Sequence, residues 1–172
     1  LEKGVVCASA GNHAQGVAFA CRKMGVPGKV YMPSVTPQQK VRKVRRFGHG
    51  VVEVVLTGDT FDDAYHEALL EAEQHGLTFV HPFDDERIIE GQGTVGLEIL
   101  EDCEEPIDYV FVAIGGGGLI SGLGSYFHQI SPHTRIIGVE PKGAPAMKRS
   151  LEAGEIVQLE HIDSFVDGAA VR

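Results

Sequence analysis

The sequence predicts an α/β fold in which helices flank parallel strands. Short apolar runs alternate with segments of helical periodicity along the whole chain. Two glycine-containing segments each stand between an apolar run and a helical segment. Strands that alternate with helices of this length are typical of βαβ units, whose strands pair in parallel.

Four apolar runs in the first half of the chain predict strands. They cover residues 4–8, 29–32, 51–56 and 78–81. The run at 51–56 is apolar at almost every position, so we expect helices on both faces of its sheet. Apolar residues at helical spacing predict helices between these strands, at residues 12–24, from Pro37 as first helical residue, and from residue 61 to a stop at Gly76.

The second of these helices has a predicted start and a predicted stop. Thr36-Pro37-Gln38-Gln39 matches a capping box, in which Thr36 accepts from the Gln39 amide. Gly48 suits the C-terminal stop. We expect a solvated face, rather than a phosphate-binding patch, for the helix's basic residues, which are Lys40, Arg42, Lys43, Arg45 and Arg46.

A long helix from about residue 86 to residue 100 is expected to bridge two α/β layers, which gives segments 1–82 and 83–172. Its inward residues are predicted to be Ile88, Ile89, Val95, Ile99 and Leu100. A buried strand at 109–114, a tight loop at 115–118 and a helix follow. The helix stripe contains Leu119, Leu123, Tyr126, Phe127 and Ile130. A strand at 135–140 and a short helix at 144–153 complete the pattern.

Composition narrows the class of protein. The 172 residues carry a formal net charge of −9, which disfavours a nucleic-acid or anionic-membrane partner. The three cysteines form no CxxC pair, and we expect free thiols in a reducing compartment. No apolar run approaches the ~20 residues that a membrane span needs. We therefore expect a cytoplasmic protein. The chain opens at Leu1 with an apolar run close behind, which suggests a cut through a domain.

The first candidate site is the segment at residues 9–16, which reads Ser-Ala-Gly-Asn-His-Ala-Gln-Gly and is called the 9–16 loop below. Free amides at a helix start attract carboxylates and phosphates, and Ser9 and Asn12 add donors there. Ser and Asn are also common N-caps, so helix capping and anion binding both stay open. His13 stands where a dinucleotide fingerprint has its middle glycine, which weakens a nucleotide interpretation.

The second candidate site is the run of four glycines before Leu119, called the 115–119 loop below. Four consecutive glycines cost conformational entropy, and a tight turn needs only one or two. Their amides can form a nest for a phosphate at the helix start. No Gly-Lys-Ser/Thr follows as in a P-loop, so a single phosphate monoester is favoured over a nucleotide. The eight histidines include no HExxH pair, and we assign no metal.

These two loops, in this order, resemble the substrate-carboxylate loop and the cofactor-phosphate loop of threonine dehydratases, fold-type II pyridoxal-phosphate (PLP) enzymes. The segments at 82–85, 91–94 and 165–171 resemble the same family. Within the family, the chain most resembles the biosynthetic branch. The resemblance implies a tryptophan synthase β-like architecture truncated at both ends. Residues 1–82 would be most of the small domain, and residues 83–172 part of the large PLP-binding domain.

The family resemblance also implies an activity and a set of residue roles. The enzyme would deaminate L-threonine, and also L-serine, and would form 2-oxobutanoate and ammonia from threonine. It would act in isoleucine biosynthesis as a homo-oligomer. Asn12 would bind the PLP 3′-oxygen, and Gly168 would lie near the cofactor ring. The substrate carboxylate would lie among Ser9, Gly11 and His13. The cofactor phosphate would be held by Gly115, Gly116, Gly117, Gly118 and Leu119.

The sequence departs from the family pattern at three places. Serine racemases have a second serine where Ala10 stands, which favours elimination over racemisation here. Glu140 and Ala144 match two positions of a cation site found in some relatives, but Ala146 replaces its aspartate. The Ser-Phe-Lys motif with the Schiff-base lysine is expected before the first loop, so we expect no catalytic residue here and an inactive isolated chain. A serine dehydratase or racemase, or a non-catalytic anion-binding module, stays open as an alternative.

Overall fold

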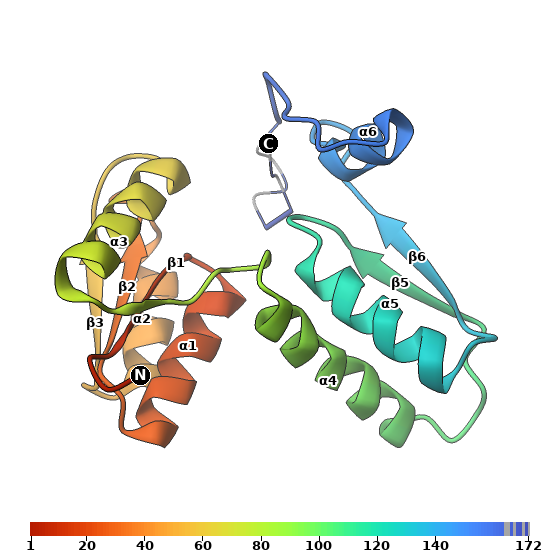
Figure 1. Ribbon diagram of the computed structural model, residues 1–172, viewed down its shortest axis with the longest axis horizontal. Coiled ribbons are helices and arrows are strands. Elements are labelled where there is room, and N and C mark those ends of the chain that lie inside the picture. Colours follow the sequence, from red (N-terminus) through yellow and green to blue (C-terminus); the bar gives the residue numbers. More distant parts are fainter. Residues whose placement is uncertain (164–165, 167, 170, 172) are drawn as a thin grey trace. The chain divides into compact units, whose positions relative to one another are not determined.

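The computed structural model describes residues 1–163, 166, 168–169 and 171, and the chain divides into two compact units, Leu1–Pro82 and Phe83–Arg172. Figure 1 shows their elements in chain order. The units have the bounds of the two segments expected from the sequence. Phe165, Asp167 and Ala170 of the last family-like segment lie outside the described residues.

The first unit contains a four-stranded parallel sheet in the order β3-β2-β1-β4. Its strands are β1 (Val5–Ala8), β2 (Gly28–Met32), β3 (Val52–Leu56) and β4 (Thr78–Phe79). One face packs on α1 (Asn12–Met24) and α2 (Gln38–Gly48), and the other packs on α3 (Phe61–His75). The expectation that helices cover both faces of this sheet is confirmed.

Two expected features of α2 are wrong. The helix begins at Gln38 with Pro37 as N-cap, so Thr36 lies one residue too early for a capping box, and no side chain caps the helix. Thr36 is buried instead. The left-handed C-cap is His49, with φ 47°. Gly48 is the last helical residue, and a Cβ there would stand 2.7 Å from Val52 Cβ, so the glycine allows the helix to approach β3.

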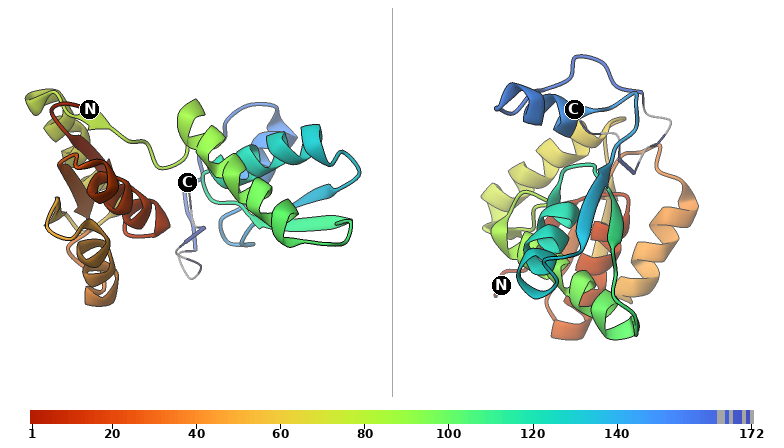
Figure 2. Two further views of the ribbon diagram at one scale, coloured as in Figure 1. Left: turned by 90° about the horizontal axis from the view of Figure 1, so that it is seen from below. Right: turned by 90° about the vertical axis from the view of Figure 1, so that its right-hand side faces the viewer.

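The second unit pairs β5 (Tyr109–Ala113) with β6 (Arg135–Val139) in parallel. Its helices are α4 (Glu86–Asp102), α5 (Gly118–Ile130) and α6 (Ala146–Ala153). Figure 2 shows α4 and α5 side by side, and Gly122 permits this contact because a Cβ there would overlap the Ile89 carbonyl of α4. The helix expected to bridge two layers therefore belongs wholly to the second unit.

The expectation that the strand at 109–114 is buried is wrong for one of its faces. Val112 packs on Leu123 and Phe127, whereas Tyr109 and Phe111 are 53% and 70% exposed. Helices of this unit cover one face of β5 and β6, and an unbroken apolar run cannot distinguish one-sided from two-sided covering.

Two residues expected inside the second unit, Val95 and Ile130, are also exposed. Among the helices of the described residues, none is both long and apolar enough to span a bilayer.

Candidate functional site

The 9–16 loop joins β1 to α1 and leaves the start of α1 uncapped by any side chain. Gly11 is the N-cap residue, and Ser9 Oγ accepts a hydrogen bond of 3.1 Å from the Gly11 amide rather than from a helical amide. Asn12 is the first helical residue and is exposed. The interpretation of Ser9 and Asn12 as helix caps is therefore wrong.

Three backbone amides at this helix start are free to bind a ligand. The first bond into the helix is from the Gln15 amide to the Gly11 carbonyl, at 3.3 Å. Within the described part of the chain, no group accepts from the amides of Asn12, His13 or Ala14. Unsatisfied amides and the helix dipole together favour an anion such as a carboxylate.

The His13 ring is held in one tautomer. Its Nε2 lies 3.1 Å from the Val80 carbonyl oxygen, which can only accept, so Nε2 carries the proton. Burial lowers the pKa of His13, and the neighbouring His81 lowers it further against the opposing effect of the Val80 bond. Neutral His13 therefore presents Nδ1 as an acceptor, and its donor to any anion at the helix start is its backbone amide.

The 115–119 loop joins β5 to α5 and exposes only backbone donors. Gly117 is the N-cap of α5 with φ 88°, a left-handed conformation that favours glycine, and no side chain caps the helix. The first helical bond runs from the Ser121 amide to the Gly117 carbonyl, at 3.0 Å. In the ranges that the structure describes, nothing accepts from the amides of Gly116, Gly118 or Leu119.

Close packing explains two more of the four glycines. A Cβ at Gly116 would overlap the Phe83 ring, and a Cβ at Gly118 would stand 2.9 Å from the Phe83 carbonyl oxygen. Met147 Cε would lie 2.9 Å from a Cβ at Gly117. The glycines therefore keep the loop backbone close against Phe83 and Met147.

The structure brings Gly168 beside the 115–119 loop, which the sequence alone could not show. A Cβ at Gly115 would lie 3.6 Å from the Gly168 carbonyl oxygen and 3.4 Å from Ala169 Cα. Phe83 lies in a segment that resembles the family, but no local pattern indicates that it packs on this loop. No pattern points to Met147 either, because both residues are far from the loop in sequence.

Glu140 lies near the same loop but contacts a helix start. Its Oε1 and Oε2 accept from the amides of Met147 and Lys148, each at 2.8 Å. In the part of the chain that the structure describes, no three His, Cys, Asp or Glu side chains are grouped to hold a metal ion.

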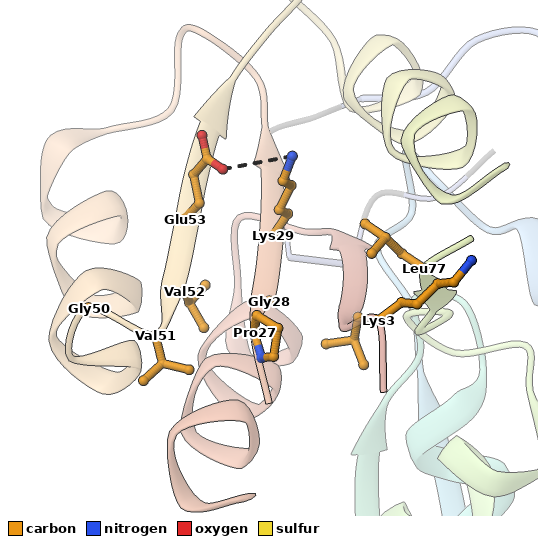
Figure 3. A pocket seen from close by; sticks show the side chains of 10 residues that line it. Lys3, Pro27, Gly28, Lys29, Gly50, Val51, Val52, Glu53 and Leu77 are labelled. Atoms are coloured by element: carbon orange, nitrogen blue, oxygen red, sulfur yellow. Dashed lines mark ion pairs between the residues drawn. The ribbon is translucent and has the colours of Figure 1, made fainter. Parts of the chain in front are cut away.

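A separate hollow of about 300 Å³ lies at the opposite end of the first unit's sheet (Figure 3). Its lining includes Lys3, Gly28 and Lys29, which lie at or before the amino ends of β1 and β2. Lys29 Nζ lies 3.9 Å from Glu53 and is also paired with Glu71. Ligands of open parallel sheets bind at the carboxyl ends of strands, where both loops lie, so this hollow is not the candidate site.

A family described as pyridoxal-phosphate dependent enzymes matches residues 1–172. The chain belongs to this family. Its members depend on PLP, in agreement with the expected cofactor, and the expected fold class is confirmed by the solved structures below.

Among the relatives, L-threonine dehydratase biosynthetic IlvA of Halalkalibacterium halodurans is 60% identical over 172 residues, covering 100% of this chain and 41% of that protein. The processed form of threonine deaminase isoform 2 from Solanum lycopersicum has a TM-score of 0.91 at 50% identity, covering 99% of this chain and 46% of that one. Maize serine racemase has a TM-score of 0.89 at 36% identity, covering 99% and 51%. The chain thus spans about half or less of the length of these relatives.

The donor set of the 115–119 loop fits the phosphate of PLP. A phosphate monoester accepts several hydrogen bonds at once, and the free amides of Gly116, Gly118 and Leu119 are donors at a helix start. Glu140, an acid of this unit that could repel a phosphate, directs both carboxylate oxygens to the amides of α6.

Proposed function

We propose that the protein carrying this chain is a PLP-dependent ammonia-lyase that deaminates L-threonine, and also L-serine, giving 2-oxobutanoate and ammonia from threonine. The observation that carries the proposal is the pair of uncapped helix starts, one rich in side-chain groups and one built from backbone alone. The match to the family of pyridoxal-phosphate dependent enzymes and the 60% identity to a relative named threonine dehydratase support the choice of substrate.

In this proposal, the 115–119 loop holds the cofactor phosphate through the amides of Gly116, Gly117, Gly118 and Leu119, with Gly115 and Gly168 lying close to the cofactor. When bound, PLP supplies the electron sink that makes the Cα proton of an amino acid acidic. Asn12 is exposed at the first turn of α1, and its side-chain amide would donate to the 3′-oxygen of PLP.

The substrate carboxylate is proposed to bind at the start of α1. Ser9 Oγ already accepts from the Gly11 amide, so its own hydroxyl proton is available for a carboxylate oxygen. The amides of Asn12, His13 and Ala14 supply further donors, and Gly11 leaves room for the approach because only Ser9 Oγ, at 4.0 Å, would be near a Cβ there. Neutral His13 contributes its backbone amide rather than a charge.

A place in isoleucine biosynthesis, a homo-oligomeric assembly and a cytoplasmic location belong to the same proposal. The word "biosynthetic" in the name of the 60% identical relative supports the first of these. Three free cysteines, two of them buried, support a reducing compartment.

The test is product analysis of the complete protein with added PLP. L-Threonine should give 2-oxobutanoate and ammonia in equal amounts. Formation of D-serine from L-serine without release of ammonia would favour the racemase alternative, which the likeness to maize serine racemase raises. PLP binding without turnover of either amino acid would favour the non-catalytic module.

A further inference from the structure

We propose that Glu140 is a positioning residue for the 115–119 loop. Its carboxylate holds the start of α6, and α6 in turn holds Met147 against Gly117. The inference rests on the proposed function, because it gives the 115–119 loop the task of binding the cofactor phosphate.

The first link joins Glu140 to α6. Glu140 directly follows β6, and its two oxygens each accept one 2.8 Å bond from the first helical turn, at Met147 and Lys148. The N-cap of α6 is Pro145, which has no side-chain acceptor for these amides. A carboxylate at an otherwise uncapped helix start is stabilised by charge-assisted hydrogen bonds and by the helix dipole.

This link matters because, in the described part of the chain, α6 has few other polar ties, such as the 3.0 Å bond from the Val157 amide to the Ser150 hydroxyl. None of its residues is buried. A hollow of about 700 Å³ lies beneath it, lined by Glu140 and Met147 together with Ile114 and Ile120. A helix without a buried face depends on its polar contacts for its position. The two Glu140 bonds are therefore expected to contribute substantially to the position of the start of α6.

The second link joins α6 to the loop. Met147 Cε would be 2.9 Å from a Cβ at Gly117, so the Met147 side chain lies against the loop backbone at that residue. Gly117 is both the left-handed residue of the loop and the N-cap of α5. Its backbone angles set the direction of the amides that follow it, at Gly118 and Leu119. Displacement of Met147 would free Gly117 to leave its left-handed conformation and would misdirect these two donors.

The experiment compares four variants of the complete protein, which are Glu140→Ala, Glu140→Gln, Met147→Ala and the control Glu152→Gln. Glu152 lines the same hollow, is exposed, and pairs only loosely with Lys148, at 3.8 Å. The readouts are the Kd for PLP, the ³¹P chemical shift of the bound cofactor, and the melting temperature as a check of folding.

Glu140→Ala is expected to raise the Kd for PLP on the order of tenfold and to move the ³¹P resonance towards that of free PLP. Met147→Ala should shift both in the same direction by a smaller amount. Glu140→Gln should recover part of the loss, because its amide oxygen still accepts one bond. Glu152→Gln should match the wild type. If Glu140→Ala does not fold, Glu140→Gln and Met147→Ala still decide the question.

The inference is overturned if wild-type protein binds PLP and the Glu140 and Met147 variants bind it with the same Kd and ³¹P shift. It is also overturned if chelation removes PLP from the wild type and a divalent cation restores it, since Glu140 would then act as a cation ligand. Failure of the wild type to bind PLP would be a different result, which removes the proposed function and this inference together.

Discussion

The 9–16 loop and the 115–119 loop both join a parallel strand to an uncapped helix, but different atoms hold them in place. In the first, side chains of the loop itself make the bonds: Ser9 Oγ accepts from the Gly11 amide, and His13 Nε2 donates to the Val80 carbonyl. In the second, the loop has no polar side chain, and Phe83 and Met147 pack against its backbone from elsewhere. The first loop should therefore tolerate a change of glycine better than the second, which loses its shape if a neighbour moves.

The largest expected effect is that of Gly116→Ala. Its methyl group would overlap the Phe83 ring, so the unit should lose roughly 1–3 kcal/mol of unfolding free energy and most of its PLP affinity. Urea denaturation and a PLP titration measure both. Gly124→Ala is the control, because Gly124 lies in α5, the helix that follows this loop, and nothing lies within 4 Å of a Cβ there. Equal stability and PLP affinity in Gly116→Ala and wild type would contradict the packing argument.

Asn12→Ala should weaken cofactor binding without destabilising the fold. The side chain is exposed at the first turn of α1, so its removal should leave the melting temperature unchanged. Loss of one hydrogen bond to a charged group costs roughly 1.5–3 kcal/mol, which is about a 10- to 100-fold weaker Kd for PLP. Fluorescence titration gives that Kd, and turnover should fall with it. An unchanged Kd and rate would show that Asn12 does not contact the cofactor.

His13→Gln should change how stability depends on pH. The folded protein holds the pKa of His13 below its ordinary value, mainly by burial, so the unfolded chain binds the proton first as pH falls. The contribution of neutral His13 to the free energy of unfolding is therefore complete above the pKa that His13 has in the unfolded chain. It is lost as the pH falls through that pKa. Between pH 7.5 and 5.5, wild type should lose more unfolding free energy than His13→Gln. Parallel curves for the two proteins would refute this.

Gly11→Ala should have only a small effect on stability, in contrast to Gly116→Ala. Gly11 has φ −118°, and a Cβ there would have only Ser9 Oγ nearby, at 4.0 Å. The unfolding free energy should change by less than about 0.5 kcal/mol. The KM for L-threonine should still rise, because the methyl group narrows the approach to the helix start. A large loss of stability would remove the contrast with Gly116.

Local patterns predicted the elements well because each pattern is complete within a few residues. The helix at 12–24 was predicted with its observed bounds, and Gly76 is the left-handed cap of α3 as expected. Predictions failed where a distant segment decides the outcome. Position 48 needs a glycine because Val52 packs against it, and Phe111 is exposed because none of the described helices of its unit covers that face of β5.

The same contrast between local patterns and distant contacts explains which parts of the candidate site could be predicted from the sequence. Both loops were found, because a glycine or a donor between a strand and a helix is a local signal. The supporting residues were not, since Phe83 and Met147 meet Gly116 and Gly117 only in the folded unit. Glu140 was singled out for a match to a cation position, whereas its observed contacts are two helix amides.

The central claim is that the 115–119 loop holds the phosphate of PLP, and a crystal structure of the complete protein with PLP tests it most directly. The account predicts the phosphate within about 3.2 Å of at least two amides among Gly116, Gly117, Gly118 and Leu119. The ring oxygen should then lie within reach of the Asn12 side chain. A phosphate bound elsewhere, with these amides bonded to the chain itself, would contradict the account.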